Sequence, residues 1–395
     1  MRFKKKILVI FNEIPCPLIH GGNIRVYHLL KELSKYYDVN LLALPSKRGH
    51  IDLSELKKFC KVIIAPCFIE EFFGKPSFFL YFIKAVYFKF ERLLSPFKSK
   101  LLLNHNYQTF CLNKMLKKIL KKENFEYIEV EHSYLGYVIE NINTKAVKIL
   151  DFHNVHSYMK NNPRERRLIK KYERDLVNKF DLAICCSEID KNRLENLGYK
   201  KIVVVPNGID TDYFREVPYS RPSSLLFVGD LTYSPNREGI KYFFKEIYPL
   251  LHKSIQINII GDYSKNQFKK ERKLKNVRFH GFVEDIRPYF TGSVFICPLL
   301  NGGGTRIKIL TAFSAGVPVI STSKGAEGIE CNDKKNIYIV DNPKLFAEKI
   351  KNIFNDCKTY NSIRKNAREL VESKYDWEKI IEKYHKDLKK LKDRK

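Results

Sequence analysis

The sequence predicts an α/β fold with two doubly wound, Rossmann-like domains. Three observations lead to this prediction. Short apolar runs alternate with amphipathic helical stretches, which is typical of a parallel sheet flanked by helices. The alternation starts again near residue 220, and the segment before the restart, 206–222, carries three prolines and a glycine. We therefore expect an N-terminal domain over residues 1–205 and a second domain over residues 206–375.

The N-terminal domain is predicted to begin with a buried strand over 6–11, KILVIF. A loop with Pro15, Pro17 and the pair Gly21-Gly22 follows, and then a helix over 23–36 with its apolar residues on one face. Further strands are expected over 39–44, 61–65, 127–130, 147–152, 182–186 and 201–205, and further helices over 113–122 and 164–179.

The second domain repeats the pattern. Strands are expected over 224–229, 256–261, 277–280, 294–297, 317–321 and 336–340, with helices over 237–251, 306–315 and 343–354, a helical turn over 285–290 and a last helix over 377–391. In doubly wound sheets, ligands bind beyond the carboxyl ends of the strands. The loops that follow strands are therefore the candidates for function.

The charge of the chain favours anionic partners. Its 395 residues include 72 Lys and Arg against 44 Asp and Glu, a net charge of +28 that both halves of the chain share. Nucleotides and phospholipid surfaces fit a field of this sign. Nucleic-acid binding is not expected, because the charge is diffuse and no recognised module is present. The hydrophobic fraction of 44% excludes a disordered chain.

The location predicted from the sequence is cytoplasmic. No run reaches the ~18 apolar residues of a spanning helix, and the apolar run 7–11 is too short for a signal peptide. The nine cysteines include no C-x-x-C pair and are expected to be buried thiols in a reducing compartment.

One stretch, 72–100, alternates aromatic and basic side chains. It is compatible with an amphipathic helix in peripheral contact with an anionic membrane, and equally with an ordinary core helix.

Two glycine-rich loops are candidates for phosphate binding. Gly21 and Gly22 lie between a strand and a helix, where backbone amides can approach a phosphate, although an ordinary turn has the same residues. Gly302 to Gly304 precede a helix expected to start near Thr305. The nearby cations Arg306 and Lys308 are disfavoured at a helix N-terminus by the dipole, which favours a diphosphate-binding role over that of solvated charges.

The most specific run is 203–214, VVVPNGIDTDYF, a strand ended by proline and an Asn-Gly turn. It resembles the domain junction of the retaining GT-B glycosyltransferases of family 4, also called glycosyl transferases group 1. Further stretches resemble the same family in matching order: LLFVGDLTYSPN (225–236), GGGTRIKIL (302–310), AGVPVIST (315–322), GAEG (325–328) and YDWE (375–378). The resemblance covers nearly the whole chain and is strongest over 203–328.

The resemblance implies two domains facing across a cleft and a last helix, 376–395, that returns to the N-terminal domain. It also implies transfer of a sugar from a nucleotide-diphosphate sugar to an acceptor hydroxyl with retention of configuration. No metal and no cofactor are expected, the nucleotide sugar being a co-substrate. The expected acceptor is a cell-surface glycan or a lipid-linked saccharide.

The resemblance assigns catalytic roles to His132 and Lys308, with a satisfied loop histidine as the alternative for His132. The residues expected to bind the donor and its diphosphate are Gly22, Asn236, Gly303, Gly304, Thr305, Arg306, Thr311 and Glu327.

The chain departs from the family at three positions. Where the family has two glutamates eight positions apart, this chain has Gly303 and Thr311. Losing a charge-assisted hydrogen bond to the ribose costs roughly 1.5–3 kcal/mol, or about ten- to a hundredfold in affinity. Asp230 stands where a basic residue is frequent, with Asn236 as its expected replacement. These departures keep open a catalytically degenerate GT-B protein that acts as a binding or scaffold subunit.

Overall fold

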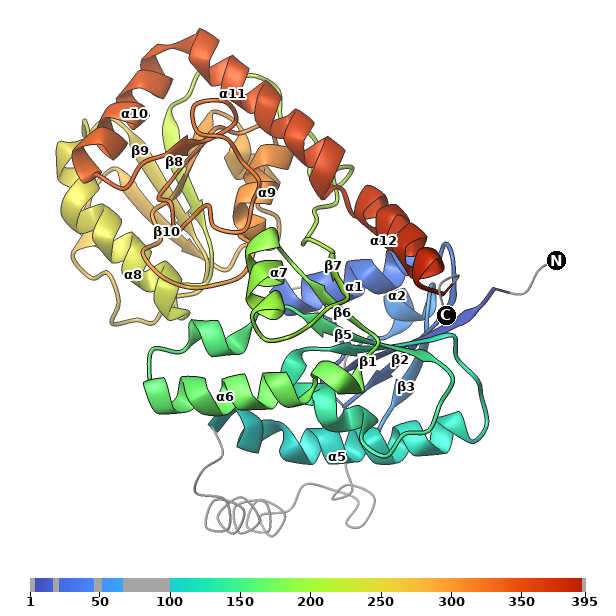
Figure 1. Ribbon diagram of the computed structural model, residues 1–395. Helices are drawn as coiled ribbons and strands as arrows, with labels where there is room; N and C mark the ends of the chain where they lie inside the picture. The colour runs from blue at the N-terminus through green and yellow to red at the C-terminus, as the bar shows by residue number, and fades with distance from the viewer. Residues whose placement is uncertain (1–3, 17–20, 46–51, 67–99, 393–395) are drawn as a thin grey trace. The chain divides into compact units, whose positions relative to one another are not determined.

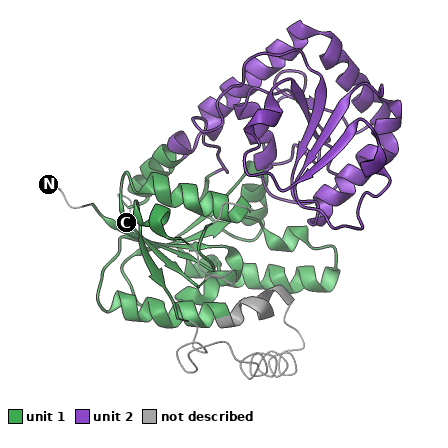
Figure 2. Ribbon diagram, turned by 180° about the vertical axis from the view of Figure 1, so that it is seen from behind, with its two compact units in different colours: residues 1–205, 381–395 green, residues 206–380 purple. Residues whose placement is uncertain are grey.

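The computed structural model describes residues 4–16, 21–45, 52–66 and 100–392, and over residues 100–107 only the backbone. The chain divides into two units, residues 1–205 with 381–395 and residues 206–380 (Figure 2). Each unit contains one parallel β-sheet with helices, so the predicted α/β class is confirmed. Apart from its last residue, the stretch 72–100 lies outside the described residues, and both interpretations of it remain predictions.

The sheet of the first unit has seven parallel strands in the order β3-β2-β1-β4-β5-β6-β7 (Figure 1). Their bounds are β1 Lys6–Phe11, β2 Asp38–Ala43, β3 Lys61–Ile64, β4 Tyr127–Glu131, β5 Val147–Phe152, β6 Leu182–Cys185 and β7 Ile202–Val204. The strand order reverses between β1 and β4, which lie side by side. At such a reversal the loops beyond the strand ends diverge, and this is where doubly wound sheets bind ligands.

The helices of the first unit include α1 Gly21–Leu33, α2 Ser54–Lys57, α5 Lys100–Leu120, α6 Pro163–Asp175 and α7 Glu188–Glu195. The sequence predicted only 113–122 of α5; residues 100–112 contain neither proline nor glycine, so nothing in them interrupts the helix. Helix α7 was not predicted. Its start is fixed by Ser187, whose side chain accepts a hydrogen bond from the backbone N–H of Asp190.

The sheet of the second unit has six parallel strands in the order β10-β9-β8-β11-β12-β13. The strands are β8 Ser224–Val228, β9 Gln256–Ile260, β10 Val277–Gly281, β11 Ser293–Cys297, β12 Val319–Ser321 and β13 Tyr338–Ile339, and the helices include α8 Ser234–Tyr242, α9 Ile307–Ser314, α10 Pro343–Asn355 and α11 Cys357–Leu370. The helix predicted over 237–251 continues beyond α8 only as a π-helical turn and a 3₁₀ turn. Pro249 lies in the 3₁₀ turn, where it offers no N–H to an α-helix.

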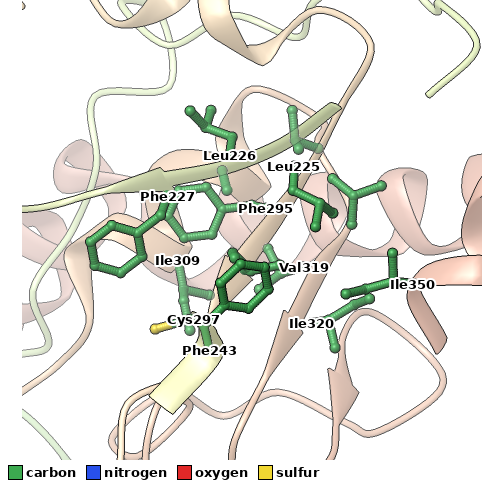
Figure 3. Packing of buried hydrophobic residues seen from close by; sticks show 14 of the residues in the cluster. Leu225, Leu226, Phe227, Phe243, Phe295, Cys297, Ile309, Val319, Ile320 and Ile350 are labelled. Atoms are coloured by element: carbon green, nitrogen blue, oxygen red, sulfur yellow. The ribbon is translucent and has the colours of Figure 1, made fainter. Parts of the chain in front are cut away.

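The core of the second unit lies between its sheet and helices α9 and α10 (Figure 3). Fully buried side chains from the strands, among them Leu225, Phe227 and Phe295, belong to one cluster with Ile309 of α9 and Ile350 of α10. Because helices cover this sheet, its strands are near-continuous apolar runs, which is why the sequence identified them.

The last helix, α12 Trp377–Lys392, places Ile381, Tyr384 and Leu388 in the core of the first unit. Tyr384 Oη donates to Glu129 Oε2 at 3.0 Å, so a hydroxyl of α12 is bonded to a carboxyl in the middle of β4. Within the described residues, no helix combines the length and the apolar character needed to cross a membrane.

The buried carboxyl of Glu129 is predicted to make stability depend on pH. Burial raises the pKa of Glu129 well above its ordinary value, so the folded chain keeps a proton that the unfolded chain releases above about pH 4.3. The free energy of unfolding therefore falls as the pH rises. Glu129→Gln should make this decline shallower between pH 5 and 8, by at most about 1.4 kcal/mol per pH unit.

Urea unfolding at several pH values measures the effect. Glu140→Gln, which changes an exposed carboxyl of the same unit, is the matched control and should leave the slope unaltered. Equal slopes for the wild type and Glu129→Gln would contradict the prediction.

Candidate functional site

In the second unit, most of the predicted donor-binding residues gather beyond the carboxyl ends of the strands. The loop after β11 leads into α9, and Gly302 and Gly304 in this loop have φ of 100° and 77°. Side chains strongly disfavour this backbone region, so the two glycines allow the loop to take its path. A Cβ on Gly302 would also lie 3.2 Å from the ring of Pro235, at the start of α8.

Lys308 is the chemically most distinctive residue of this region. Its Nζ donates to Asn236 Oδ1 at 2.7 Å and lies 4.3 Å from the centre of the Phe227 ring. Asn236 in turn donates to the carbonyl of Asp230 at 2.7 Å. Among the described residues, Lys308 forms no ion pair with a carboxylate. Burial lowers its pKa to about 8, so the ammonium charge is only weakly stabilised before a ligand binds.

Gly229 explains how the ammonium fits at the end of β8. A Cβ on this residue would lie 2.4 Å from Lys308 Nζ and 2.9 Å from Asn236 Nδ2. Real Cβ atoms do not approach other heavy atoms so closely, so only glycine leaves room for the Lys308–Asn236 contact.

Arg306 has a different position from the one expected for a diphosphate ligand. Its guanidinium is 7% exposed and turns back onto the loop, where it donates to the carbonyls of Gly303, Asn301 and Lys324. Arg306 therefore stabilises the conformation of the glycine loop through these hydrogen bonds. Neither Arg306 nor Lys308 is an exposed charge on the first turn of α9.

Thr305, Thr311 and Glu327 differ in what they offer a ligand. Thr305 Oγ1 is buried and has no hydrogen-bond partner among the described residues, and Gly328 lies against its backbone. Thr311 is buried in α9, and its hydroxyl donates to the carbonyl of Ile307 at 3.0 Å. Glu327 pairs with Lys324. The Thr305 hydroxyl therefore lies in the glycine loop without a partner among the described residues, whereas the Thr311 hydroxyl is bonded within its own helix.

In the first unit, Gly22, His132 and His153 come together at the reversal between β1 and β4. The position that a Cβ of Gly22 would occupy is 3.7 Å from both His132 Nε2 and His153 Nδ1. The ring centres of the two histidines are 3.8 Å apart. Gly22 belongs to the first turn of α1, so two imidazole nitrogens face the positive end of a helix.

The backbone of His132 is held in an uncommon conformation. Its φ is 70°, and its N–H donates to the carbonyl of Asp151 on the neighbouring strand at 3.0 Å. Its ring stacks on Tyr134 with centres 4.7 Å apart. Strained residues of this kind cluster at functional sites, and the choice between a catalytic role and a satisfied loop histidine for His132 remains a prediction.

A buried cluster of charged groups lies behind the two histidines. Glu131 and Asp151 are fully buried at the ends of β4 and β5, and Arg25 of α1 is 1% exposed. Arg25 Nε donates to Asp151 Oδ2 at 2.8 Å, and Arg25 Nη1 donates to the carbonyl of Val205 at 2.9 Å. His153 Nε2 lies 2.6 Å from Glu131 Oε2.

From the sequence, the stretch Asp151 to Asn154 at the end of a strand is a cluster that could line the cleft, with a structural His153 as the alternative. Arg25 and Glu131 were not singled out, although two signals of them are present. Glu129 and Glu131 alternate within an otherwise apolar strand, and Arg25 falls on the apolar face of α1 with Leu29 and Leu33. A charge at such positions is buried if the helix and strand form at all, and a buried charge needs a partner.

Glu131, Asp151 and His153 each have a possible metal-ligand atom, and these atoms lie within 4.8 Å of one another. Arg25 already supplies the positive charge beside Asp151, and a second cation there would be repelled. We assign no metal to this group, and the expected independence of metal remains a prediction.

Comparison with known proteins identifies the family. A model described as glycosyl transferases group 1 matches residues 222–356, and a model described as Glycosyltransferase Family 4 matches residues 19–213. An uncharacterized 44.6 kDa protein in the cps region of Klebsiella pneumoniae is 25% identical over 415 residues, covering 97% of this chain and 99% of that protein.

Two solved structures show the fold. Sucrose-phosphate synthase from Thermosynechococcus elongatus superimposes with a TM-score of 0.75 at 17% identity, over 99% of this chain and all of that one. Anabaena HepE in complex with UDP and glucose superimposes with a TM-score of 0.68 at 14% identity, over 98% of this chain and all of that one. The two parallel sheets, the glycine loop before α9 and the matches in both halves lead to one conclusion: the chain belongs to the group 1 glycosyltransferases of family 4 and has the GT-B fold.

Proposed function

We propose that this glycosyltransferase moves a sugar from a nucleoside-diphosphate sugar to a hydroxyl of a saccharide, with retention of configuration and without a metal. The observation that carries the proposal is Lys308, a lysine held by Asn236 and lacking a carboxylate partner among the described residues. Such a lysine is best satisfied by an anionic ligand. The complex of Anabaena HepE with UDP and glucose supports a nucleotide-sugar donor.

The chemistry proposed for the second unit is stabilisation of the leaving diphosphate. Negative charge grows on the diphosphate as the bond to the sugar breaks, and preorganised donors lower the barrier to that step. Lys308, the amides of loop 302–305 and the Thr305 hydroxyl would provide these donors. Arg306 would hold the loop in shape and add positive potential.

In the first unit we propose that Gly22 and His132 contact the transferred sugar. The acceptor proposed is a saccharide of a cell-surface glycan, free or lipid-linked. The full-length relative in a cps region supports this class of acceptor, and family 4 membership supports retention.

A second candidate is a protein that keeps the fold but binds no donor. It is favoured by Thr311, whose hydroxyl is already bonded to Ile307 and offers no charge to a ribose. Binding of nucleotides separates the two candidates, because the second predicts none.

One nucleotide class is expected to stabilise the protein. In a thermal-shift panel of UDP, GDP, ADP and their common sugar conjugates, a ligand at a hundred times its Kd should add about 2.7 kcal/mol of stability. The shift should persist in EDTA if no metal is required. No shift from any nucleotide would support the second candidate.

Replacing Lys308 should weaken binding of the nucleotide that the panel identifies. Lys308→Met removes the charge but keeps the length, so Kd should rise about ten- to a hundredfold. Lys245→Met, at an exposed lysine of the same unit, is the control and should bind like the wild type. Equal affinities for the two variants would show that Lys308 does not contact the ligand.

The affinity should also depend on pH through Lys308. Its pKa of about 8 in the free protein means that the ammonium is lost as the pH rises, and an anion binds only the protonated form well. Above about pH 8, Kd should increase up to tenfold per pH unit. Lys308→Arg stays charged over this range, so isothermal titration of this variant should show a flat profile. A flat profile in the wild type would contradict the prediction.

A further inference from the structure

The contact between Glu131 and His153 bears on which ring nitrogen of His153 carries a proton. The sequence does not show this contact. His153 is 6% exposed, Glu131 is fully buried, and Nε2 lies 2.6 Å from Oε2. The other ring nitrogen, Nδ1, lies 3.7 Å from the position that a Cβ of Gly22 would occupy. A buried imidazole therefore has one nitrogen fixed by a carboxyl and the other directed at the first turn of α1.

The charges around the pair limit its protonation. Three carboxyl groups, those of Glu129, Glu131 and Asp151, are fully buried, and Arg25 is the cation that reaches them. Arg25 neutralises Asp151 through its direct ion pair. Burial raises the pKa of Glu129 and of Glu131, and it lowers the pKa of His153 to about 4.

Among the described residues, the other groups that face the pair include no further lysine or arginine that could offset a carboxylate. Tyr384 of α12 binds Glu129, and burial raises the pKa of this tyrosine. Cys186, after β6, is fully buried, and its pKa is raised to about 12. The ring of His132 lies against His153 on the side of Gly22. A net negative charge on Glu131 and His153 would thus be uncompensated, so the pair is neutral as a whole.

A neutral pair has three proton arrangements. In the first, the protonated carboxyl of Glu131 donates to Nε2 of a neutral imidazole, and in the second an ionised Glu131 accepts from Nε2 of an imidazolium; Nδ1 carries a proton in both. In the third, the carboxyl proton lies on Oε1 and Nε2–H donates to Oε2, so that Nδ1 is unprotonated. The Nε2–Oε2 distance of 2.6 Å is shorter than the roughly 2.7–3.2 Å of a neutral N–H···O bond and favours the first two.

We infer that Glu131 is a positioning residue that keeps His153 Nδ1 protonated, so that His153 presents a fixed N–H donor beside Gly22 to an oxygen of the bound substrate. The oxygen belongs to a phosphate or to a sugar hydroxyl, since both bear lone pairs that accept from an imidazole. It follows that His153 binds substrate by donation and does not take the proton of the acceptor hydroxyl. The identity of the substrate rests on the proposed function, whereas the position of the proton does not.

The position of the proton is tested without substrate by ¹⁵N NMR of the histidine side chains. Protonated and unprotonated ring nitrogens have well separated ¹⁵N shifts, and the signals of His153 are assigned by their loss in His153→Asn. We expect a protonated Nδ1 from pH 6 to 8. A neutral ring with the proton on Nε2 would overturn the inference, whatever the protein transfers.

The role of Glu131 is tested by two variants of similar size. Glu131→Gln can still donate an N–H to His153 Nε2, so Nδ1 should remain protonated. Glu131→Met cannot, so the ring should become a mixture of tautomers. Identical spectra for the two variants, with melting temperatures showing that both are folded, would refute the positioning role.

The contact with substrate is tested by two variants of His153. Asparagine places its amide near the position of Nδ1, whereas glutamine reaches the position of Nε2 and keeps the bond to Glu131. If Nδ1 donates to substrate, His153→Asn should retain about tenfold more kcat/KM than His153→Gln. If the imidazole only satisfies Glu131, the order is reversed, and the substrate contact is refuted.

The oxygen that accepts from His153 Nδ1 belongs either to a phosphate or to a sugar hydroxyl. The two are distinguished by adding UDP and UDP-glucose, and GDP and GDP-mannose, to the ¹⁵N-labelled protein. A shift of the Nδ1 signal with both the nucleotide and its conjugate indicates a phosphate oxygen, and a shift with the conjugate alone indicates a sugar hydroxyl. If the ligands bind by thermal shift but leave the Nδ1 signal unmoved, the donor contact is refuted. If none binds, the proposed function fails, while the position of the proton remains measured.

Discussion

The structure depends on one constraint: both sheets are parallel and have helices packed against them. A charged side chain within such a strand is buried, so it needs a hydrogen-bond or ion-pair partner close to it. The first unit shows how this is done. Glu129, Glu131 and Asp151 are fully buried on β4 and β5, and each has its own partner: Tyr384, His153 and Arg25, respectively. These partners come from α12, the end of β5 and α1. The polar cluster therefore links the last helix of the chain to the turn that carries Gly22.

The strand ends of the two units are electrostatically different. In the first unit the buried Arg25 is paired with a carboxylate, and burial lowers the pKa of His153. In the second unit Lys308 has an amide oxygen as its partner, and it forms no direct ion pair with a carboxylate of the described residues. A buried cation in an ion pair has its charge compensated within the fold, whereas an unpaired one is best satisfied by an anionic ligand. This contrast is the physical reason for assigning the diphosphate to the second unit.

Arg306 and Lys308 also illustrate that two cations of one loop can have separate tasks. The guanidinium has several donors in a fixed plane, and three backbone carbonyls of the neighbouring loops accept from it. The ammonium of Lys308 is a compact charge that fits against Gly229 and Asn236. Asn236, which stands in for a basic residue of the family, thus orients the lysine. The loss of charge at Thr311 is not accompanied by a loss of the groups suited to a diphosphate.

The sequence by itself determined the fold class, the restart of the alternation near residue 220 and the strands of both sheets, because buried parallel strands are continuous apolar runs. The resemblance to the family pointed to Gly22, His132, Asn236 and Lys308, and their roles remain predictions. The sequence pattern missed α2, α7, α11 and the N-terminal half of α5, where helix formation depends on capping and on contacts distant in the chain.

Only the tertiary structure shows which contacts the candidate residues make. Arg306 donates to backbone carbonyls, and Thr311 donates to a carbonyl of its own helix. Arg25, Glu131, Asp151 and His153 form one buried cluster. These partners are separated by up to 128 residues between Arg25 and His153. Hydrogen bonds, burial and the resulting protonation states depend on distances of a few ångströms between such residues, and no local pattern in a sequence encodes those distances.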